Sequence, residues 1–451
     1  MSVTCDKSGW LSRCFEPIWF FAFVPFKFAE AVLITLLPLF VVQVANGSVA
    51  DVGQIHSLIS LAGVVAFIVW GNLSDKFGRR RPFLIVGFLG FAVCTALLAL
   101  GNGVREVAIF STLAGFFIAA VTPVASALVL NSFPEQQWAP VFGRFYQIAG
   151  WSFVGGVLLG SAWLTLRPEA LSNAQAMRSL LLFSGGFACL SFICCLLWVR
   201  ESREFRKKRR FTRQLLGRLT VAAIERRAIF YPSRMMYFVL RAGWQGHLQK
   251  LVGGPLLSYY GCSGLFFFAI TLVYIPLPIF LTDVLGATNS QVFLITLGKA
   301  AIEAFFYMPV GRFVQQRRGI SLQAWATAAR VVIFLIFTAV ALMQPSAMSL
   351  IIVGVTHLFT GLTWAAINVS STTVVAALAA KGQEGMAIGL YNSILGSATI
   401  LGSVIGGLLA ASFGYGACFI LAAILTTVTS VVLWKLQDAM PNPTLTASQV
   451  T

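Results

Sequence analysis

The sequence predicts an all-α membrane protein with twelve transmembrane helices, arranged as two pseudo-symmetric six-helix bundles. Three observations support this prediction. The 451 residues are 58% hydrophobic and 10% charged, and 39 of them are phenylalanine, a composition that a water-soluble domain cannot bury. Apolar segments long enough to cross a bilayer recur along the chain. The second half of the chain also repeats the pattern of the first half.

Twelve apolar segments, separated by charged residues or by glycine, proline and asparagine, predict the membrane spans. We expect each of them to be helical, because a helix satisfies its own backbone hydrogen bonds in hydrocarbon. The first span carries two charges and no cleavage site follows it, so we expect it to remain in the mature protein. The predicted spans are 18–44, 52–71, 83–101, 106–130, 141–164 and 179–199, followed by 264–285, 290–312, 322–343, 348–379, 386–411 and 416–435.

The two halves of the chain match after a shift of about 240 residues, which indicates a duplicated six-helix unit. Gly71 aligns with Gly311 at a shift of 240 residues. At a shift of 246 residues, four glycines recur, namely Gly143, Gly150, Gly156 and Gly160 against Gly389, Gly396, Gly402 and Gly406. We read these glycines as sites of close helix packing. Repeated halves are typical of secondary transporters, in which the halves rock about a site between them.

This duplication divides the chain into an N-terminal bundle over residues 1–200, a basic central loop over 201–262, and a C-terminal bundle with a short tail over 263–451. Lysine and arginine accumulate on one side of the spans. Twelve lie in the termini and short inner connections, against three in the outer connections. Because basic residues favour the cytoplasmic side, we expect both termini to be cytoplasmic and the protein to lie in a plasma or inner cell membrane.

The central loop has fourteen basic residues from Arg200 to Lys250, including RKKRR at 206–210. We expect it to lie against anionic lipid headgroups, which attract such basic segments. We expect no nucleic-acid partner, because no nucleic-acid-binding fold signature accompanies the basic run.

The stretch GNLSDKFGRRRP at 71–82 places one acid and four bases between the second and third predicted spans. A glycine permits close helix approach or a tight turn, and an acid here can pair with a base or face the N-terminal end of a neighbouring helix. The bases alone could also serve only to fix orientation. The residues of interest are Gly71, Asp75, Lys76, Gly78, Arg79 and Arg80.

These six residues resemble the signature loop of the major facilitator superfamily, a family of polytopic secondary transporters. The resemblance extends over the whole chain through the helix count, the duplication and the long basic central loop. It implies a cytoplasmic gate in which Asp75 meets the start of the eleventh helix, near residues 382–386. It also implies that helices 1, 4, 7 and 10 line a central cavity and that helices 2, 5, 8 and 11 flank it.

Among the charged residues inside predicted spans, four form two pairs, Lys27 with Glu30 and Lys299 with Glu303. Their spacing places the members of each pair on one helix face. A charge near the bilayer centre costs at least ~2.5–3.5 kcal/mol on insertion scales. Each pair is therefore either a self-neutralising structural ion pair or a functional site. We expect a functional site, in which a glutamate takes up and releases a proton and a lysine binds substrate or acts as a switch partner.

The tenth predicted helix carries His357, Trp364 and Asn368, whose spacing places them on one helix face. A polar stripe beside a tryptophan suits the wall of a binding site. Hydrogen bonding between helices explains the same stripe equally well.

Together these features predict a secondary active transporter that moves a small organic solute by alternating access, and we expect protons to be the coupling ion. The alternatives are a lipid or amphipathic-drug exporter or flippase on the same fold, or a transporter-like sensor. An enzyme is a poor interpretation, because the sequence has neither a phosphate-binding glycine loop nor an HExxH motif. The eight cysteines are scattered, so we expect no metal, no cofactor and no disulfide framework. We expect a monomer.

The predicted orientation can be tested by cysteine labelling in intact cells. In a variant without native cysteines, Lys208→Cys should react with a membrane-impermeant maleimide only after the cells are permeabilised, because the central loop faces the cytoplasm. Arg167→Cys, in a predicted outer connection, should react without permeabilisation. The opposite pattern would reverse the assigned orientation.

Overall fold

The computed structural model describes residues 18–77, 80–132, 138–199, 255–316, 319–378 and 384–439. These residues form helices joined by short connections and contain no strand. Within these ranges, twelve helical segments are long and apolar enough to cross a membrane. The predicted fold class, an all-α membrane protein with twelve spans, is therefore confirmed.

The first six spans are continuous helices, and the first of them begins with a short 3₁₀ segment. They comprise η1 (Ile18–Phe23), a 3₁₀ segment that continues into α1 (Val24–Gln43), and then α2 (Val49–Phe77), α3 (Arg81–Leu100), α4 (Val104–Ser132), α5 (Trp138–Leu166) and α6 (Asn173–Trp198).

The seventh span is interrupted and consists of α11 (Pro255–Tyr274), α12 (Leu277–Ile279) and the π-helical segment η4 (Phe280–Val284). It begins nine residues before the predicted start at 264, because Tyr259 and Tyr260 are buried in the protein and extend its apolar helix. The remaining spans are α13 (Asn289–Gln316), α14 (Gly319–Leu342), α15 (Ala347–Leu378), α16 (Glu384–Phe413) and α17 (Tyr415–Ala439).

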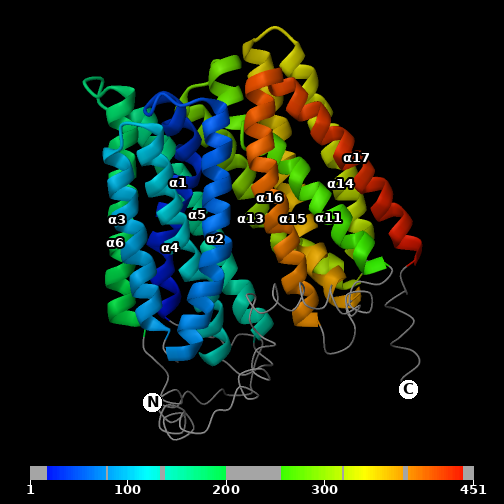
Figure 1. Cartoon of the computed structure of the whole chain (residues 1–451), viewed down its shortest axis with the longest axis horizontal. Coiled ribbons are helices and arrows are strands. Elements are labelled where there is room, and N and C mark those ends of the chain that lie inside the picture. Colours follow the sequence, from blue (N-terminus) through cyan, green and yellow to red (C-terminus); the bar gives the residue numbers. More distant parts are fainter. Residues whose placement is uncertain are drawn as a thin grey trace, which may run out of the picture.

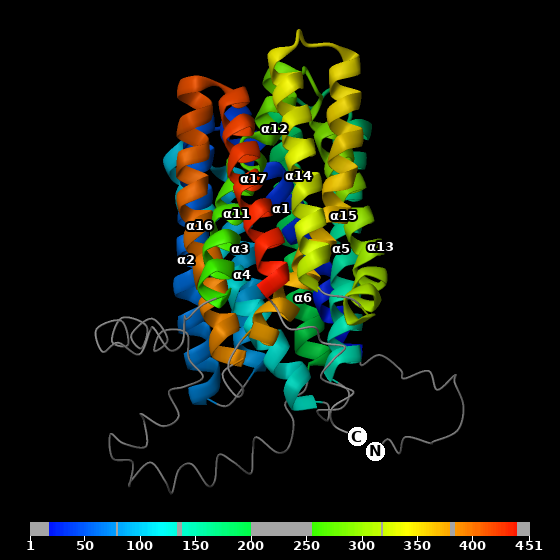
Figure 2. The same cartoon turned by 90° about the vertical axis from the view of Figure 1, so that its right-hand side faces the viewer.

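The twelve spans form two groups that lie side by side in Figure 1 and one behind the other in the turned view of Figure 2. We call α1–α6 the N-terminal half and α11–α17 the C-terminal half. The principal contacts between the halves pair α2 with α16 and α5 with α13. The two pairs are equivalent under the duplication, because α2 and α13 are the second spans of their halves, and α5 and α16 are the fifth. The repeat in the sequence is thus a repeat in the structure.

Helix α1 begins and α17 ends at the same end of the molecule, which we call the terminal end (Figure 1). At the opposite end, the start of α2 touches the last turns of α16. A Cβ atom on Gly53 would lie 2.3 Å from the carbonyl oxygen of Ser403 and 2.9 Å from Cα of Gly407. No residue with a side chain fits there without moving one helix, so the two backbones are in direct contact.

A cluster of three amide side chains joins the halves at the same end. Gln43 ends α1, Asn173 begins α6 and Asn289 begins α13. The Nε2 atom of Gln43 donates to Oδ1 of Asn289 at 3.0 Å, and Nδ2 of Asn289 donates to Oε1 of Gln43 at 2.9 Å and to Oδ1 of Asn173 at 3.1 Å. This amide cluster and the glycine contact close the opposite end of the interface between the halves.

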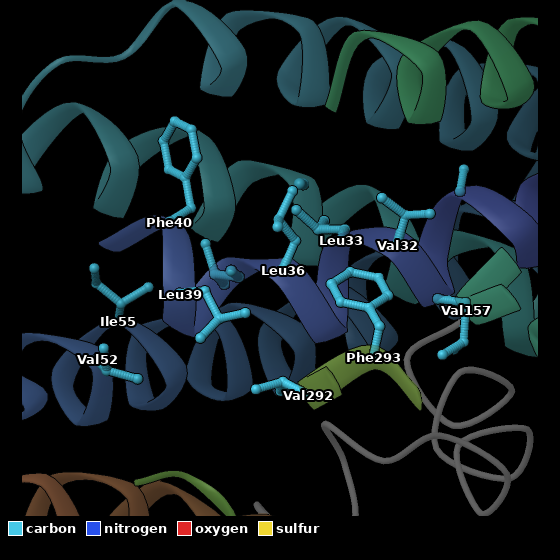
Figure 3. Close-up of a cluster of buried hydrophobic side chains, with 14 of the residues drawn as sticks. Val32, Leu33, Leu36, Leu39, Phe40, Val52, Ile55, Val157, Val292 and Phe293 are labelled. Atoms are coloured by element: carbon cyan, nitrogen blue, oxygen red, sulfur yellow. The ribbon is translucent and has the colours of Figure 1, made fainter. Parts of the chain in front are cut away.

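Helix α1 is buried around most of its surface and forms the apolar centre of the N-terminal half (Figure 3). A helix that is apolar on all sides belongs inside a protein. Its side chains pack with residues of α2, α5 and α13, and the close-up includes Val32, Leu36, Leu39, Phe40, Val52, Ile55, Val157 and Phe293. The few polar groups of α1 are therefore held in fixed positions.

The stretch that resembles the signature loop lies where α2 ends and α3 begins, at the terminal end. Gly71, Asp75 and Lys76 are in the last two turns of α2, and Arg80 is the N-cap residue of α3. Gly78 and Arg79 lie outside the described residues, as does the central loop from 200 to 254. The gating role of Asp75 stays a prediction.

The glycine contact can be tested with Gly53→Ala. The added methyl group should force α2 away from α16, so that a cysteine in place of the buried Ser403 reacts severalfold faster with a water-soluble maleimide in the purified, otherwise cysteine-free protein. Gly63→Ala is the matched control, because a Cβ atom at Gly63 on the same helix has no heavy atom within 4 Å. Equal labelling rates in the two variants would contradict a contact that holds this end closed.

Candidate functional site

A cavity of about 530 Å³ lies between the two halves. Helices α1, α2 and α5 line it from the N-terminal half, and every span of the C-terminal half except α17 contributes to the other side. It reaches Val292, one turn along α13 from the amide cluster. Much of its wall is apolar, as at Phe153, Phe267 and Leu281. Its size lies within the ~300–1,000 Å³ of small-molecule sites.

An acid-containing network lies on the cavity side of α13. Nζ of Lys299 is 2.6 Å from Oε2 of Glu303, and both residues line the cavity. The hydroxyl of Tyr307 donates to Oε1 of Glu303 at 2.7 Å, and Nδ2 of Asn368 on α15 donates to that hydroxyl oxygen at 3.3 Å. Both oxygens of the carboxylate have a partner, which fixes its orientation. We call these four residues the carboxylate network.

A close approach of α15 to α13 brings a tryptophan beside this network. A Cβ atom on Gly361 would lie 2.3 Å from the carbonyl oxygen of Lys299, so the backbones touch where the lysine begins. Nζ of Lys299 then lies 5.9 Å from the ring centre of Trp364. A cation at this distance from an indole ring is attracted to its π face.

Arg330 of α14 reaches the same cavity, and the sequence analysis did not single it out. The side chain is 1% exposed. Its Nε atom donates to Oγ1 of Thr363 at 2.7 Å, Nη2 donates to the carbonyl oxygen of Thr360 at 2.7 Å, and Nη1 donates to the hydroxyl of Tyr274. Arg330 lies inside the predicted span 322–343, so the cost of a charge in hydrocarbon was a signal that could have found it.

The predicted stripe on α15 has two different environments. His357 and Trp364 line the cavity, and His357 is 6% exposed. The Nδ1 atom of His357 is buried and has no hydrogen-bond partner, and its ring lies 5.7 Å from that of Tyr274. Asn368 contacts Tyr307 of α13. His357 and Trp364 are therefore part of the cavity wall. Asn368 instead makes a hydrogen bond between helices α15 and α13.

The other predicted pair, Lys27 and Glu30, also forms an ion pair. Neither residue is among those that line the cavity. Glu30 is on the same face of α1 as Ile34 and Pro38, which do line it, because the three are spaced by four residues. The pair therefore lies about one turn from the cavity, toward the terminal end.

The helices that form the cavity differ from those expected. Among the described residues, α4 contributes none to its lining, although the fourth helix was expected to line a central cavity. The ninth span, α14, contributes Arg330 instead. Its long side chain passes between α11 and α15 and is held there by Tyr274, Thr360 and Thr363. Among the described residues, the charged ones that line the cavity all belong to the C-terminal half.

Two six-helix halves that enclose a cavity with buried charges at their interface define a transporter of the membrane. The sequence matches the family model of the Major Facilitator Superfamily over residues 19–367 and 260–450. The chain belongs to this family, whose members are transporters, as its signature-like loop predicted.

Several relatives are resistance, export or transport proteins by name. The chain is 34% identical over 140 residues to the tetracenomycin C resistance and export protein of Streptomyces glaucescens, covering 29% of this chain and 26% of that protein. It is 25% identical over 194 residues to multidrug resistance protein 3 of Bacillus subtilis (42% and 36%) and 29% identical over 178 residues to the staphyloferrin B transporter of Staphylococcus aureus (38% and 41%). The matched regions thus span less than half of each relative.

Solved structures of the same fold extend over nearly the whole chain. A variant of the nucleoside transporter NupG superposes with a TM-score of 0.72 at 12% identity, covering 93% of this chain and 98% of that one. A D-xylose-proton symporter superposes with a TM-score of 0.69 at 15% identity, covering 93% and 96%. At these identities the likeness establishes the fold alone.

Breaking the ion pair of α13 should destabilise the protein. Glu303→Gln leaves Lys299 without its partner and should lower the melting temperature in detergent. The loss of unfolding free energy should be smaller than the ~3–5 kcal/mol of fully buried pairs, because the side chains of Lys299 and Glu303 are 28% and 17% exposed. The double variant Lys299→Met with Glu303→Leu should recover most of the lost stability. Asp283→Asn, at an exposed carboxylate, is the control. A double variant no more stable than Glu303→Gln would show that charge is not the cause.

Proposed function

We propose that this protein is a secondary active transporter that moves a small organic solute across the membrane by alternating access, with protons as the coupling ion. The observation that carries the proposal is the position of Glu303. It is an ionisable group at the wall of a cavity between two pseudo-symmetric halves, it is paired with a lysine, and it is only partly exposed. Intramembrane carboxylates that face a cavity are typical of proton pathways.

The closure of the opposite end supports alternating access. The amide cluster is made of neutral side chains, and each of its hydrogen bonds has a net value of only ~0.5–1.5 kcal/mol, because water can replace the partner. The second closure is a contact between two glycine-bearing helices, which involves no ion pair among the described residues. Such contacts can form and break as the halves rock. In this proposal Asp75 has the corresponding role at the terminal end.

The carboxylate network gives proton uptake a local consequence. Protonation of Glu303 removes its charge, and Lys299 then loses the ion pair that holds its Nζ atom. The released lysine remains next to Trp364 at the cavity wall, where it can attract solute. Proton binding and solute binding thereby share one side chain, which is the requirement for coupling. The alternative coupling site is Glu30, which is paired with Lys27 on α1 about one helical turn from the cavity.

A second candidate function is the export of amphipathic compounds or lipids. The predominantly apolar wall of the cavity favours it, and two of the relatives named above are called a resistance and export protein and a multidrug resistance protein. Protein-dependent scrambling of fluorescent phospholipids in reconstituted vesicles would support the lipid form of this alternative.

Coupling can be tested by separating driven accumulation from exchange. If Glu303 is the coupling site, Glu303→Gln should abolish accumulation of solute driven by a pH gradient in proteoliposomes. Exchange of solute without a gradient should continue, because it requires binding and rocking but no net proton movement. The matched variant Glu30→Gln carries the same chemical change on α1 and should retain accumulation.

The reverse result in these two variants would move the coupling site to α1. Accumulation that continues in both Lys299→Met with Glu303→Leu and Lys27→Met with Glu30→Leu would refute proton coupling at either pair. The solutes for this experiment are aromatic carboxylates with their matched amides and aminomethyl cations, together with a nucleoside and a pentose.

A further inference from the structure

The cavity has an uncompensated positive charge. Among the described residues that line it, three are charged, and they are Lys299, Glu303 and Arg330. Lys299 and Glu303 neutralise one another at 2.6 Å. No carboxylate of the described residues forms an ion pair with Arg330. A charge that is removed from water and left unpaired is strongly unfavourable, so such a group normally has a counter-ion.

The hydrogen bonds of Arg330 hold it in place without neutralising it. Its three acceptors, Thr363, the carbonyl group of Thr360 and Tyr274, are all uncharged. A guanidinium group has five N–H donors. Three of them are used, and one N–H on each of Nη1 and Nη2 makes no hydrogen bond within the described part of the chain. An arginine held in this way presents a fixed fork, the geometry that suits a carboxylate or another oxyanion.

A second cation lies near the same aromatic ring as the guanidinium group. Cζ of Arg330 is 6.0 Å and Nζ of Lys299 is 5.9 Å from the ring centre of the same residue, Trp364. Two positive groups from different helices thus lie within about 6 Å of the centre of one aromatic ring on the cavity wall. An anion bound in this region is attracted by the charge of both cations.

Further polar atoms around the cavity are without partners. Nδ1 of His357, Nε2 of His56 and Oγ1 of Thr35 are each buried and form no hydrogen bond to any described residue, and all three residues line the cavity. His357 belongs to the C-terminal half, whereas Thr35 and His56 are on α1 and α2 of the N-terminal half. Buried polar groups are normally hydrogen-bonded. A ligand with polar groups at both ends can satisfy atoms of both halves at once.

We propose that the solute is a monovalent organic anion with an apolar body, an inference that rests on the transport function proposed above and names its substrate class. The acid group binds to the guanidinium group of Arg330 on the side where Lys299 and Trp364 line the cavity. The body lies against the apolar wall that includes Phe153 and Phe267. A hydrogen-bonding group at the far end of the molecule lies on the side of the cavity lined by Thr35 and His56. The bound anion supplies the counter-ion that Arg330 lacks.

The test uses probes that differ only in charge. Benzene, naphthalene and biphenyl are each used as the carboxylate, the primary amide and the aminomethyl cation. Calorimetric titration of the purified full-length protein in detergent should give a carboxylate affinity about tenfold or more above that of the matched amide in at least one series, as expected for a charge-assisted bidentate contact. The cations should not bind. A naphthalene sulfonate distinguishes a site for carboxylates from one for any monovalent oxyanion.

Two variants test the role of Arg330. Arg330→Gln should bring the affinity for the carboxylate to within about threefold of that for the amide, since the neutral variant lacks the charge that makes such contacts strong. Thr363→Asp keeps the arginine and places an internal carboxylate where Nε now donates at 2.7 Å. It should fold at least as stably as the wild type and lose the preference for anions. Arg178→Gln is the control, because Arg178 donates to the carbonyl group of Ala99 and to Asn102 and does not line the cavity.

The inference is overturned if no carboxylate of the three series binds, if amides or cations bind as tightly as carboxylates, or if Thr363→Asp retains the full anion preference. Uptake of the same probes into proteoliposomes separates this inference from the proposed function. Transport of neutral or cationic probes that is unaffected by Arg330→Gln would leave the transport function standing and refute the anion site. Anion binding without protein-dependent flux of any probe would refute the transport function and leave the anion site.

Discussion

Hydrocarbon solvates neither a backbone polar group nor a charge, and this constraint determines where each polar atom of the chain can lie. Backbone groups are satisfied within the twelve helices. The charges of the described spans lie in ion pairs, in the neutral hydrogen-bond cradle around Arg330, or near the helix ends. The cavity between the halves is where a charge can meet a partner that is not part of the protein. Function and folding are thus linked, because the same intramembrane charges that are costly for stability also define the site.

The duplicated architecture separates rigid parts from a movable interface. Within the N-terminal half, α1 is surrounded by apolar contacts that leave it little freedom (Figure 3). Between the halves, apolar contacts such as that of Phe293 on α13 with α5 are accompanied by contacts of another kind, with glycine against glycine at α2 and α16, and amide against amide at the start of α13. Well-packed bodies joined through small and reversible contacts can rotate as units. The arrangement therefore fits rocking of two halves better than deformation of either half.

The sequence was sufficient for the fold, since helix number and duplication follow from composition and spacing, and the family from the resemblance of residues 71–80 to its signature loop. It was less informative about the site. Lys27 with Glu30 and Lys299 with Glu303 are almost equivalent as sequence patterns, yet only the second pair lines the cavity, because position relative to the other half is a tertiary property. Arg330 has no acid one turn away on its helix, so a search for local pairs passed over it. Tyr274 gave no signal, because its partner Arg330 lies on another helix. Tyr307 lies one turn after Glu303 on α13, and a search for charged pairs does not include tyrosine.

The neutrality of the amide cluster has a consequence for energetics under a membrane potential. Gln43, Asn173 and Asn289 carry no net charge, so neither ionic strength nor voltage acts strongly on the contacts that they make. The charges that could sense the electric field across the bilayer include those of Lys299, Glu303 and Arg330 in the cavity wall and those of Lys27 and Glu30 on α1, together with any charge on the bound solute. Voltage dependence of the transport cycle would therefore arise from these charges, and the amide contacts that close the opposite end would respond little to the membrane potential.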